Sequence, residues 1–314
     1  MDLTLIHNPE AGAGHPTRDD LIALARDAGY RVRYFDTDGN AYVRALDEPG
    51  DLVLVAGGDG TVAEVAKALV RRDVPLAIAP LGTANNIAFT LGVRGSPKEI
   101  IEGLRDASLT PLDVGRATAP WGEGCFIESA GIGFFGSLLR RLRDGADRVS
   151  DQGTSPVARA ARNFLRALQS YRPTRHHVLA DGEDLSGTYL LVEAMNIRSI
   201  GPRMVLAPEA DPGDGHLELV RVRDTDRRVF AEYLEALAGG AAEAPPVESR
   251  RVQRVSLVWD AAHGHLDDEA WPEGGHGPPG ADVRLAPTVD IEIVAPPVQV
   301  LTIRRAPSPV APSP

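Results

Sequence analysis

The sequence predicts an α/β domain followed by a domain rich in β-strands, within a chain of 314 residues. In the first third of the chain, short apolar runs alternate with helical patterns, which is typical of βαβ units around a mostly parallel sheet. After Asp113 helical patterns become rare, and one short strand candidate follows another, which is an all-β pattern. A chain of this length also favours two domains over one or three.

The first part has a regular order of elements. Thr17 with Asp20 three residues later predicts a capped helix start, and Gly29 lies where a C-terminal glycine belongs. Apolar residues at helical spacing predict a second helix over 62–69 and a third over 87–91. The expected strands are 3–6, 32–35, 52–56 and 76–79.

The second part combines strands with two helical stretches. Its strand candidates are 126–128, 177–180, 189–194, 217–222, 255–259 and 291–294. Helices are expected near 156–169 and 228–237, and Gly/Pro-rich loops at 239–246 and 273–280. The predicted domains are 1–113 and 114–297, with 298–306 as a candidate addition to the first domain and 307–314 as a disordered tail.

Composition and charge exclude several classes of protein. Lys and Arg number 33 against 44 Asp and Glu, a net charge of −11, so nucleic acid is not an expected partner. Cys125, the only cysteine, excludes an internal disulfide framework, and its apolar neighbours predict a small buried side chain. The chain shows no signal-peptide pattern and no apolar run near the ~20 residues that span a bilayer. We therefore expect a cytoplasmic protein whose membrane contact is peripheral.

A glycine-rich turn with the sequence Gly-Gly-Asp-Gly-Thr follows the third expected strand. Gly57, Gly58 and Gly60 let an anion approach the backbone, and the unpaired N–H groups of the following helix carry partial positive charge. Asp59 beside phosphate needs a cation between them, which favours a nucleoside triphosphate with Mg²⁺. The competing interpretation is a plain strand-to-helix connection with Thr61 as N-cap.

Two further polar turns follow strands of the same predicted sheet. Residues 80–86, Pro-Leu-Gly-Thr-Ala-Asn-Asn, come after the fourth strand, and 8–12, Asn-Pro-Glu-Ala-Gly, come after the first. Ligands in open α/β sheets bind beyond the carboxyl ends of the strands, where all three turns are expected. Taken alone, Asn8 is better explained by an Asx-turn.

Together, the three turns resemble the catalytic domain of the diacylglycerol kinase and sphingosine kinase family, above all its bacterial lipid kinases. The resemblance implies a Rossmann-like nucleotide-binding domain followed by a β-sandwich with added helices, with ATP and substrate in the cleft between them. The nucleotide-binding residues that it implies are Asn8, Pro9, Thr37, Gly57, Gly58, Asp59, Gly60, Thr61, Glu64, Gly82, Thr83 and Asn85.

Three residues depart from the family pattern. Ala63 stands where Asn is usual, Asn86 where Asp is usual, and Asp268 where Gly is usual. The change at position 86 deletes a charge near the expected nucleotide, although an amide still donates and accepts hydrogen bonds. Asp268 is acceptable in a turn because Asp tolerates the left-handed conformation.

The loop 206–217 resembles the family's metal-binding loop. The resemblance implies a structural Mg²⁺ held by Asp214, with further oxygen atoms from Asp211 and from the backbone carbonyl of His216. Hard cations prefer oxygen ligands, so these residue types suit the ion. From the residues alone, a polar β-turn is the preferred interpretation.

The segment 264–272 resembles the family's Leu-Asp-Gly-Glu turn, which carries the carboxylate proposed to accept the proton of the substrate hydroxyl. Either Asp267 or Glu269 can be this base, with Asp59 completing the catalytic set. An extended segment would point Asp267 and Glu269 the same way, whereas a tight turn would make them diverge. The competing interpretation is a solvated acidic hairpin tip.

These expectations combine into an ATP-dependent lipid kinase that uses Mg²⁺ and phosphorylates a lipid hydroxyl at a membrane surface. The alternatives are a NAD kinase-like small-molecule kinase, which shares the Gly-Gly-Asp-Gly-Thr turn, and a non-catalytic nucleotide-binding module. The basic apolar segment 131–143 is compatible with an anionic membrane, but an amphipathic surface helix is favoured. The lipid and the oligomeric state, a homodimer included, are left open.

Overall fold

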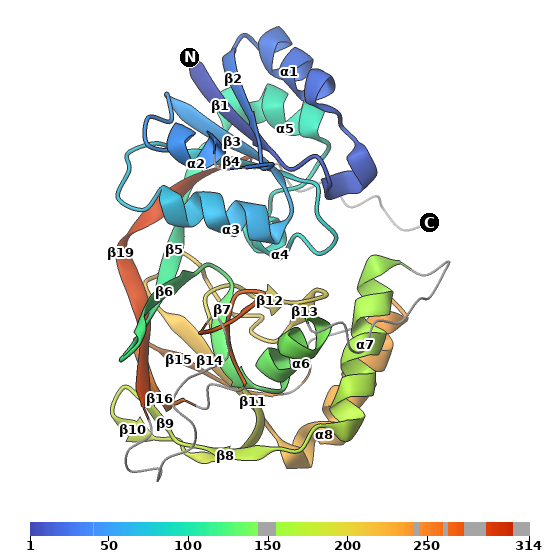
Figure 1. Cartoon of the computed structure of the whole chain (residues 1–314), viewed down its shortest axis with the longest axis vertical. Coiled ribbons are helices and arrows are strands. Elements are labelled where there is room, and N and C mark those ends of the chain that lie inside the picture. Colours follow the sequence, from blue (N-terminus) through green and yellow to red (C-terminus); the bar gives the residue numbers. More distant parts are fainter. Residues whose placement is uncertain are drawn as a thin grey trace, which may run out of the picture.

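The computed structural model describes residues 1–39, 41–143, 155–240, 245, 247–259, 263–272 and 287–303. The tail 307–314, the loop 273–280 and most of the loop 239–246, on which the sequence made predictions, lie outside these residues. The chain forms two bodies that are joined by two long strands, β5 (Ser108–Ala119) and β19 (Thr288–Thr302), as Figure 1 shows.

A parallel sheet forms the centre of the first domain. Its strands lie in the order β2, β1, β3, β4. The strand bounds are β1 Asp2–His7, β2 Arg31–Asp36, β3 Leu52–Gly57 and β4 Leu76–Pro80. Every residue of β3 is buried, which explains its uninterrupted apolar sequence, since a central parallel strand is covered on both faces. The four predicted strands are thus present.

Helices cover this sheet and connect its strands (Figure 1). Helix α1 begins at the predicted capping box, in which the Thr17 side chain accepts from Asp20 N, and Gly29 follows it with a φ of +86°. The helices of the first domain are η1 Ala11–Gly14, α1 Arg18–Asp27, α2 Ala41–Ala45, α3 Asp59–Ala68, α4 Asn86–Thr90, α5 Pro97–Gly103 and η2 Leu104–Asp106.

The strands β5 and β19 extend the sheet of the first domain into the second. They pair with each other in antiparallel fashion, with a register shift between Val294 and Val298. Near its end, β19 also pairs in parallel with β4, where Val300 lies opposite Leu76. The residues from 298 to 302 therefore add a strand to the first domain's sheet.

Two packed sheets form the second domain. The outer half of the large sheet contains β6 Gly122–Phe126, β9 Val178–Ala180, β10 Glu183–Asp184 and β16 Arg254–Val258, beside β5 and β19. The other sheet contains β7 Ser129–Gly133, β8 Thr174–His176, β11 Gly187–Met195, β14 Leu217–Arg223, β15 Glu248–Val252, β17 Gly264–Leu266 and β18 Glu269–Ala270. Phe126, Tyr189 and Trp259 lie in the core between them. This arrangement confirms the predicted α/β domain followed by a sandwich.

A second core lies between the smaller sheet and three helices, α6 (Phe134–Arg143), α7 (Pro156–Ser170) and α8 (Arg227–Ala238). Phe134, Phe135 and Leu138 of α6 are buried there, so these apolar side chains are used in packing within the protein. Short elements, η3 Asp224–Asp226, β12 Ser199–Ile200 and β13 Met204–Val205, complete the domain. None of the helices in the described part of the chain has the length and apolar character needed to cross a membrane.

The predicted strand over 126–128 was partly wrong. Strand β6 ends at Phe126, and Ile127 and Glu128 connect it to β7. The N–H groups of these two residues do not enter a strand ladder because both donate to the carboxylate of Asp267. This connection is part of the site described next.

Candidate functional site

The three turns predicted to share a sheet edge do so. The Asn8 side chain donates to Thr61 Oγ1 at 3.3 Å, and its Oδ1 accepts from Glu10 N at 3.0 Å, so it forms an Asx-turn and also contacts the glycine turn. Thr37 lies at the same edge, where its N–H donates to the His7 carbonyl at 3.0 Å. Pro9 continues the turn after β1.

The glycines of the two later turns have different roles. A Cβ on Gly82 would lie 2.5 Å from the Cα of Gly58, so the two turns pack backbone against backbone. A Cβ on Gly57 would lie 2.9 Å from the Thr61 Cβ. In contrast, a Cβ on Gly60 would have as its nearest neighbour an Asp268 oxygen, 3.8 Å away. Gly60 is thus the glycine that faces open space and the second domain.

The side chains of the turn at 82–86 hold its shape. Asn85 is left-handed, with a φ of +52°, and its amide both accepts from Gly82 N and donates to Gly82 O at 2.8 Å. Asp59 Oδ1 accepts from Ile87 N at 3.1 Å, at the start of α4. Burial raises the pKa of Asp59, although backbone N–H groups of residues 85–87 partly offset this. The start of α4 is therefore occupied by a carboxylate of the chain itself, and Thr83 is the exposed residue of this turn.

Glu64 points away from the glycine turn toward α2. Tyr42 Oη donates to Glu64 Oε2 at 2.8 Å, and burial together with this carboxylate raises the pKa of Tyr42 to about 12. One helical turn further, Lys67 reaches the second domain instead. Helix α3 therefore presents its polar side chains to two different parts of the molecule.

The acidic segment forms a tight turn. Leu266 pairs with Glu269, which leaves Asp267 and Asp268 as the two residues of the turn. The left-handed residue is Asp267, with a φ of +51°, and not Asp268 as the sequence had suggested. Asp267 is 6% exposed, whereas Asp268 and Glu269 are exposed. Of the two predicted geometries, the structure has the one in which Asp267 and Glu269 diverge.

Asp267 connects the two domains. Its Oδ1 accepts from Ile127 N at 2.9 Å and Glu128 N at 2.7 Å, and its Oδ2 lies 3.3 Å from Lys67 Nζ of α3. Burial raises the pKa of Asp267, while Lys67 and the two N–H groups lower it part of the way. His265 Nδ1 contacts the Asp267 carbonyl at 2.9 Å, which adds support to the turn.

Sequence reasoning missed Glu128. Its side chain is 6% exposed, and burial together with the negative charges of Asp59 and Asp267 raises its pKa well above the usual value. Asn86 Nδ2 donates to Glu128 Oε2 at 3.3 Å. The only signal was an isolated acid within the run Cys-Phe-Ile-Glu-Ser-Ala, which had been assigned to a strand.

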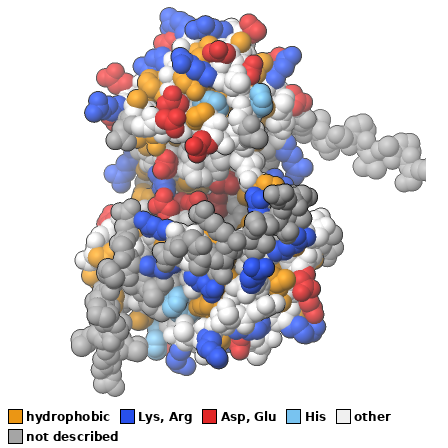
Figure 2. Space-filling view, turned by 45° about the vertical axis from the view of Figure 1, so that its right-hand side comes forward, with side chains coloured by type: hydrophobic (Ala, Val, Ile, Leu, Met, Phe, Trp, Pro, Cys, Tyr) orange, Lys and Arg blue, Asp and Glu red, His pale blue; other side chains and the backbone are white. Residues whose placement is uncertain are grey.

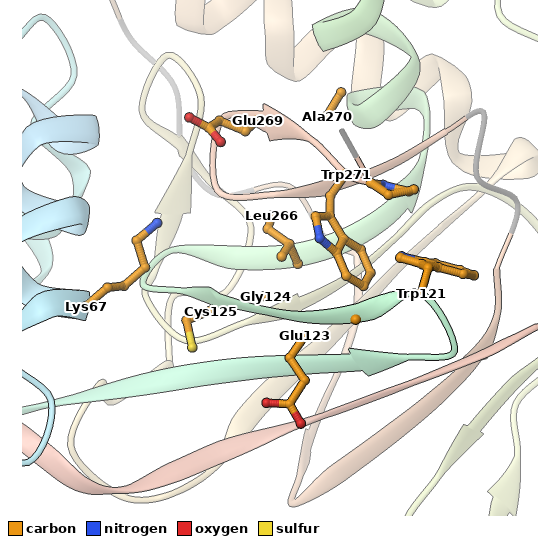
Figure 3. Close-up of a pocket in the computed structure, with 11 residues that line it drawn as sticks. Lys67, Trp121, Glu123, Gly124, Cys125, Leu266, Glu269, Ala270 and Trp271 are labelled. Atoms are coloured by element: carbon orange, nitrogen blue, oxygen red, sulfur yellow. The ribbon is translucent and has the colours of Figure 1, made fainter. Parts of the chain in front are cut away.

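A cavity of about 540 Å³ lies between α3 and the second domain (Figure 3). Glu269 and Lys67 lie at one side of it, while Trp271 and Trp121, with ring centroids 5.5 Å apart, provide an aromatic wall. Cys125 also lines the cavity and is exposed, so the prediction of a buried thiol was wrong; it alternates along β6 with the buried Phe126.

Glu269 borders a second cavity of about 360 Å³, which is also lined by Asp268 and by Leu139 and Arg143 of α6. Figure 2 shows acidic side chains gathered at the constriction between the two domains. The position of Glu269 between the two cavities makes it the exposed carboxylate of the acidic turn that a ligand in either cavity can approach.

The predicted metal loop forms a hydrogen-bonded turn. Asp214 Oδ1 accepts from His216 N at 2.9 Å, and its Oδ2 lies 2.9 Å from Arg251 Nη2. Asp211 Oδ1 accepts from Gly213 N at 3.2 Å. Among the residues that the structure describes, no group of three or more His, Cys, Asp or Glu is placed to hold a metal ion. With Arg251 on Asp214, this arrangement does not fit a metal site as it stands, and the site remains a prediction.

Comparison with known families identifies both domains. The diacylglycerol kinase catalytic domain matches residues 2–117, and the YegS C-terminal NAD kinase beta sandwich-like domain matches residues 147–289. These two matches follow one another along the chain, in the order of the two domains described above.

Individual relatives agree with these matches. The chain is 32% identical over 219 residues to a "Probable lipid kinase YegS-like" of Klebsiella pneumoniae, covering 66% of this chain and 70% of that protein. It is 27% identical over 277 residues to a "Diacylglycerol kinase" of Mycobacterium tuberculosis, covering 85% and 88%.

The fold agrees as well. The crystal structure of a diacylglycerol kinase from Bacillus anthracis superimposes with a TM-score of 0.62 at 18% identity, covering 96% of both chains. The matches span both domains in the expected order, and the chain therefore belongs to the diacylglycerol kinase catalytic-domain family of kinases, together with the YegS-like lipid kinases.

Proposed function

We propose that the protein is an ATP-dependent lipid kinase that transfers the γ-phosphate of ATP to a lipid hydroxyl. The observation that carries this proposal is the approach of two distant segments: Gly60 of the glycine turn faces Asp268 of the acidic turn across the domain interface. Phosphoryl transfer depends mainly on positioning and charge neutralisation, so the two turns together offer a place for nucleotide and acceptor.

The phosphates of ATP would lie against Gly58, Gly60 and the start of α3. A phosphate has room beside Gly60 at the start of α3. The start of α4 offers no such room, because the Asp59 carboxylate already accepts from Ile87 N there. A cavity of about 320 Å³ beside Asn85 is lined by Arg94 and Arg203, and guanidinium groups pair well with phosphate oxygens. Mg²⁺, when bound with ATP, would neutralise the phosphate charge.

The acceptor would enter the cavity lined by the tryptophans. Its wall of Trp121, Trp271 and Leu266 suits an apolar lipid better than the dinucleotide NAD. Glu269 at the edge of this cavity would accept the hydroxyl proton, and buried Asp267 would hold the turn in place. Peripheral membrane contact and a homodimer stay predictions.

The test is a transfer assay with the intact protein. γ-Labelled ATP and Mg²⁺ are supplied with phosphatidylglycerol vesicles that contain diacylglycerol, and in parallel with NAD. Label in the organic phase supports the proposal. Label on NAD would favour the small-molecule kinase, and ATP binding without any transfer, across a panel of hydroxyl lipids, would favour a non-catalytic module.

A variant pair tests the acceptor cavity. Trp271→Ala should raise the KM for the lipid severalfold and leave the KM for ATP unchanged, because Trp271 lines the cavity beside Glu269. Leu179→Ala is the matched control, since Leu179 is an exposed apolar residue of β9 that does not line this cavity. Equal lipid KM values in parent and Trp271→Ala would remove the cavity from the proposal.

A further inference from the structure

Glu128 forms hydrogen bonds with three parts of the molecule. Its backbone N–H donates to Asp267 Oδ1 at 2.7 Å, and its carbonyl accepts from Asn196 N at 2.9 Å. Its side chain accepts from Asn86 Nδ2 of the first domain at 3.3 Å. One residue thus touches the turn at 82–86, the acidic turn and the segment after β11.

The surroundings of position 86 favour an amide while residue 128 is an acid. Asn86 Nδ2 donates to Glu128 Oε2 and, at 3.0 Å, to the Gly201 carbonyl, while its Oδ1 accepts from Ser199 Oγ at 3.0 Å. Asn86 is 2% exposed, so water does not readily replace these partners. A carboxylate at 86 would leave the Gly201 carbonyl without its donor and would place a second acid against the Glu128 carboxyl.

The charges around Glu128 also disfavour a carboxylate at position 86. The charged groups that face Glu128 are the carboxylates of Asp59, Asp267 and Asp268, and the nearby ammonium of Lys67 is paired with Asp267. One more carboxylate at 86 would add to a region that already has an excess of negative charge. An amide at 86 and an acid at 128 are therefore matched to each other.

We infer that Glu128 and Asn86 form an acid–amide pair across the domain interface, in which Glu128 bears the carboxyl group that the family pattern places at position 86. The pair holds the turn at 82–86 against the acidic turn, so both are positioning residues for the phosphoryl transfer proposed above, on which this part rests. It follows that restoring the usual residue, Asn86→Asp, harms this protein.

Four variants of the full chain test the pair. Asn86→Asp should lower kcat by about 10-fold or more, with a smaller change in the KM for ATP, because the facing acids push the turns apart. Glu128→Gln keeps an acceptor for Asn86 Nδ2 and should stay within about 3-fold of the parent. The double variant Asn86→Asp/Glu128→Gln removes the facing acid but leaves the Gly201 carbonyl without its donor, so it should recover part of the lost kcat. Glu128→Ala leaves Asn86 without this partner and should lose about 10-fold.

Thermal unfolding gives a readout that does not need kinase activity. Two facing buried carboxyl groups raise each other's pKa, so the stability of Asn86→Asp should be highest at low pH and fall as the pH rises. Relative to the parent, its Tm should therefore drop more at pH 8 than at pH 5.5. Adding Glu128→Gln should remove most of this pH-dependent difference, whereas Glu248→Gln, which removes a carboxylate of β15 that pairs with Arg221 and Arg223, should not.

Each result of these measurements either supports the Glu128–Asn86 pair or overturns it. Full activity and parental Tm of Asn86→Asp, or a double variant no better than Asn86→Asp, would overturn the pair. Should Asn86→Asp fail to fold, folding of the double variant supports the pair and its failure refutes it. If the parent phosphorylates no lipid, the proposed function falls, while the unfolding measurements still test the acid–amide pair.

Discussion

The glycine turn at 57–61 and the acidic turn at 267–269 face each other but are held in place by different means. In the first domain, the turns are shaped by contacts among themselves, such as Asn8 with Thr61. The acidic turn instead depends on a buried carboxylate, Asp267, held by the β6–β7 connection and by Lys67 of the other domain. The glycine turns are thus shaped within the first domain, whereas the acidic turn is held by its own domain and, through Lys67, by the first domain as well.

Substitution of Glu269, an exposed carboxylate of the acidic turn, should have the largest effect on activity. Glu269→Gln removes the proposed base but no contact that holds the turn, so lipid phosphorylation should fall by about 10²- to 10⁴-fold with ATP affinity unchanged. The measurement is steady-state transfer of label to the lipid, with ATP binding followed by calorimetry.

Asp267→Asn is the contrasting variant, since it weakens the contact with Lys67 and leaves Glu269 in place. It should lower the Tm along with kcat, whereas Glu269→Gln should lower kcat alone. Full turnover in Glu269→Gln would show that Glu269 is not the base, which would then have to be Asp267 or a carboxylate of the first domain.

The glycine turns provide the next test. Gly82→Ala places a Cβ 2.5 Å from the Gly58 Cα, an overlap between backbones that costs about 1–3 kcal/mol and lowers the Tm by roughly 2–10 °C. Gly60→Val, by contrast, extends into open space toward Asp268 and should keep the fold while weakening ATP binding. Tight ATP binding by Gly60→Val would place the phosphates elsewhere.

The sequence predicted those features that depend on neighbours along the chain. The strands of the first domain, the Thr17 cap and the shared sheet edge follow from apolar periodicity and local hydrogen bonds. Glu128 was missed because its partner Asn86 lies on another domain, and nothing local marks their contact. Cys125 was misassigned for the same reason: its neighbours are apolar, but its face of β6 borders a cavity made by distant residues.

Thermal unfolding with and without Mg²⁺ tests whether the predicted metal loop, residues 206–217, binds an ion that stabilises the second domain. If Asp214 binds Mg²⁺, the ion must displace Arg251, and saturating Mg²⁺ should raise the parent's Tm by about 2 °C or more through linkage. Asp214→Ala should lose this increase, and Arg251→Ala should enlarge it because the competing guanidinium is gone. A parent Tm insensitive to both Mg²⁺ and chelator would leave the loop as a polar turn held by its own hydrogen bonds.

The smallest expected effect is the pH dependence of stability near the domain interface. Burial raises the pKa of Asp59, Glu128 and Asp267 above the usual carboxyl values. Such a group binds its proton more tightly in the folded state, so its contribution to stability is present at low pH and is lost as the pH rises through the folded pKa. His265 acts in the same direction, since burial lowers its pKa but its contacts with Glu193 and Asp267 together raise it by more, whereas burial lowers the pKa of His7 and opposes the trend.

The raised pKa values of three carboxyl groups and of His265 favour stability at low pH, and only the lowered pKa of His7 among these groups opposes them. We therefore expect the parent's Tm to rise as the pH falls from 8 toward 5. Asp267→Asn removes one of the titrating groups while its side-chain oxygen can still accept from Ile127 N and Glu128 N. Its Tm should consequently change less over this range than that of the parent, even though its absolute Tm is lower. The measurement is thermal unfolding at fixed ionic strength across the pH series. An Asp267→Asn profile parallel to the parent's would mean that Asp267 stays ionised throughout, held by Lys67, and that the burial of this carboxylate is fully compensated by its contacts across the domain interface.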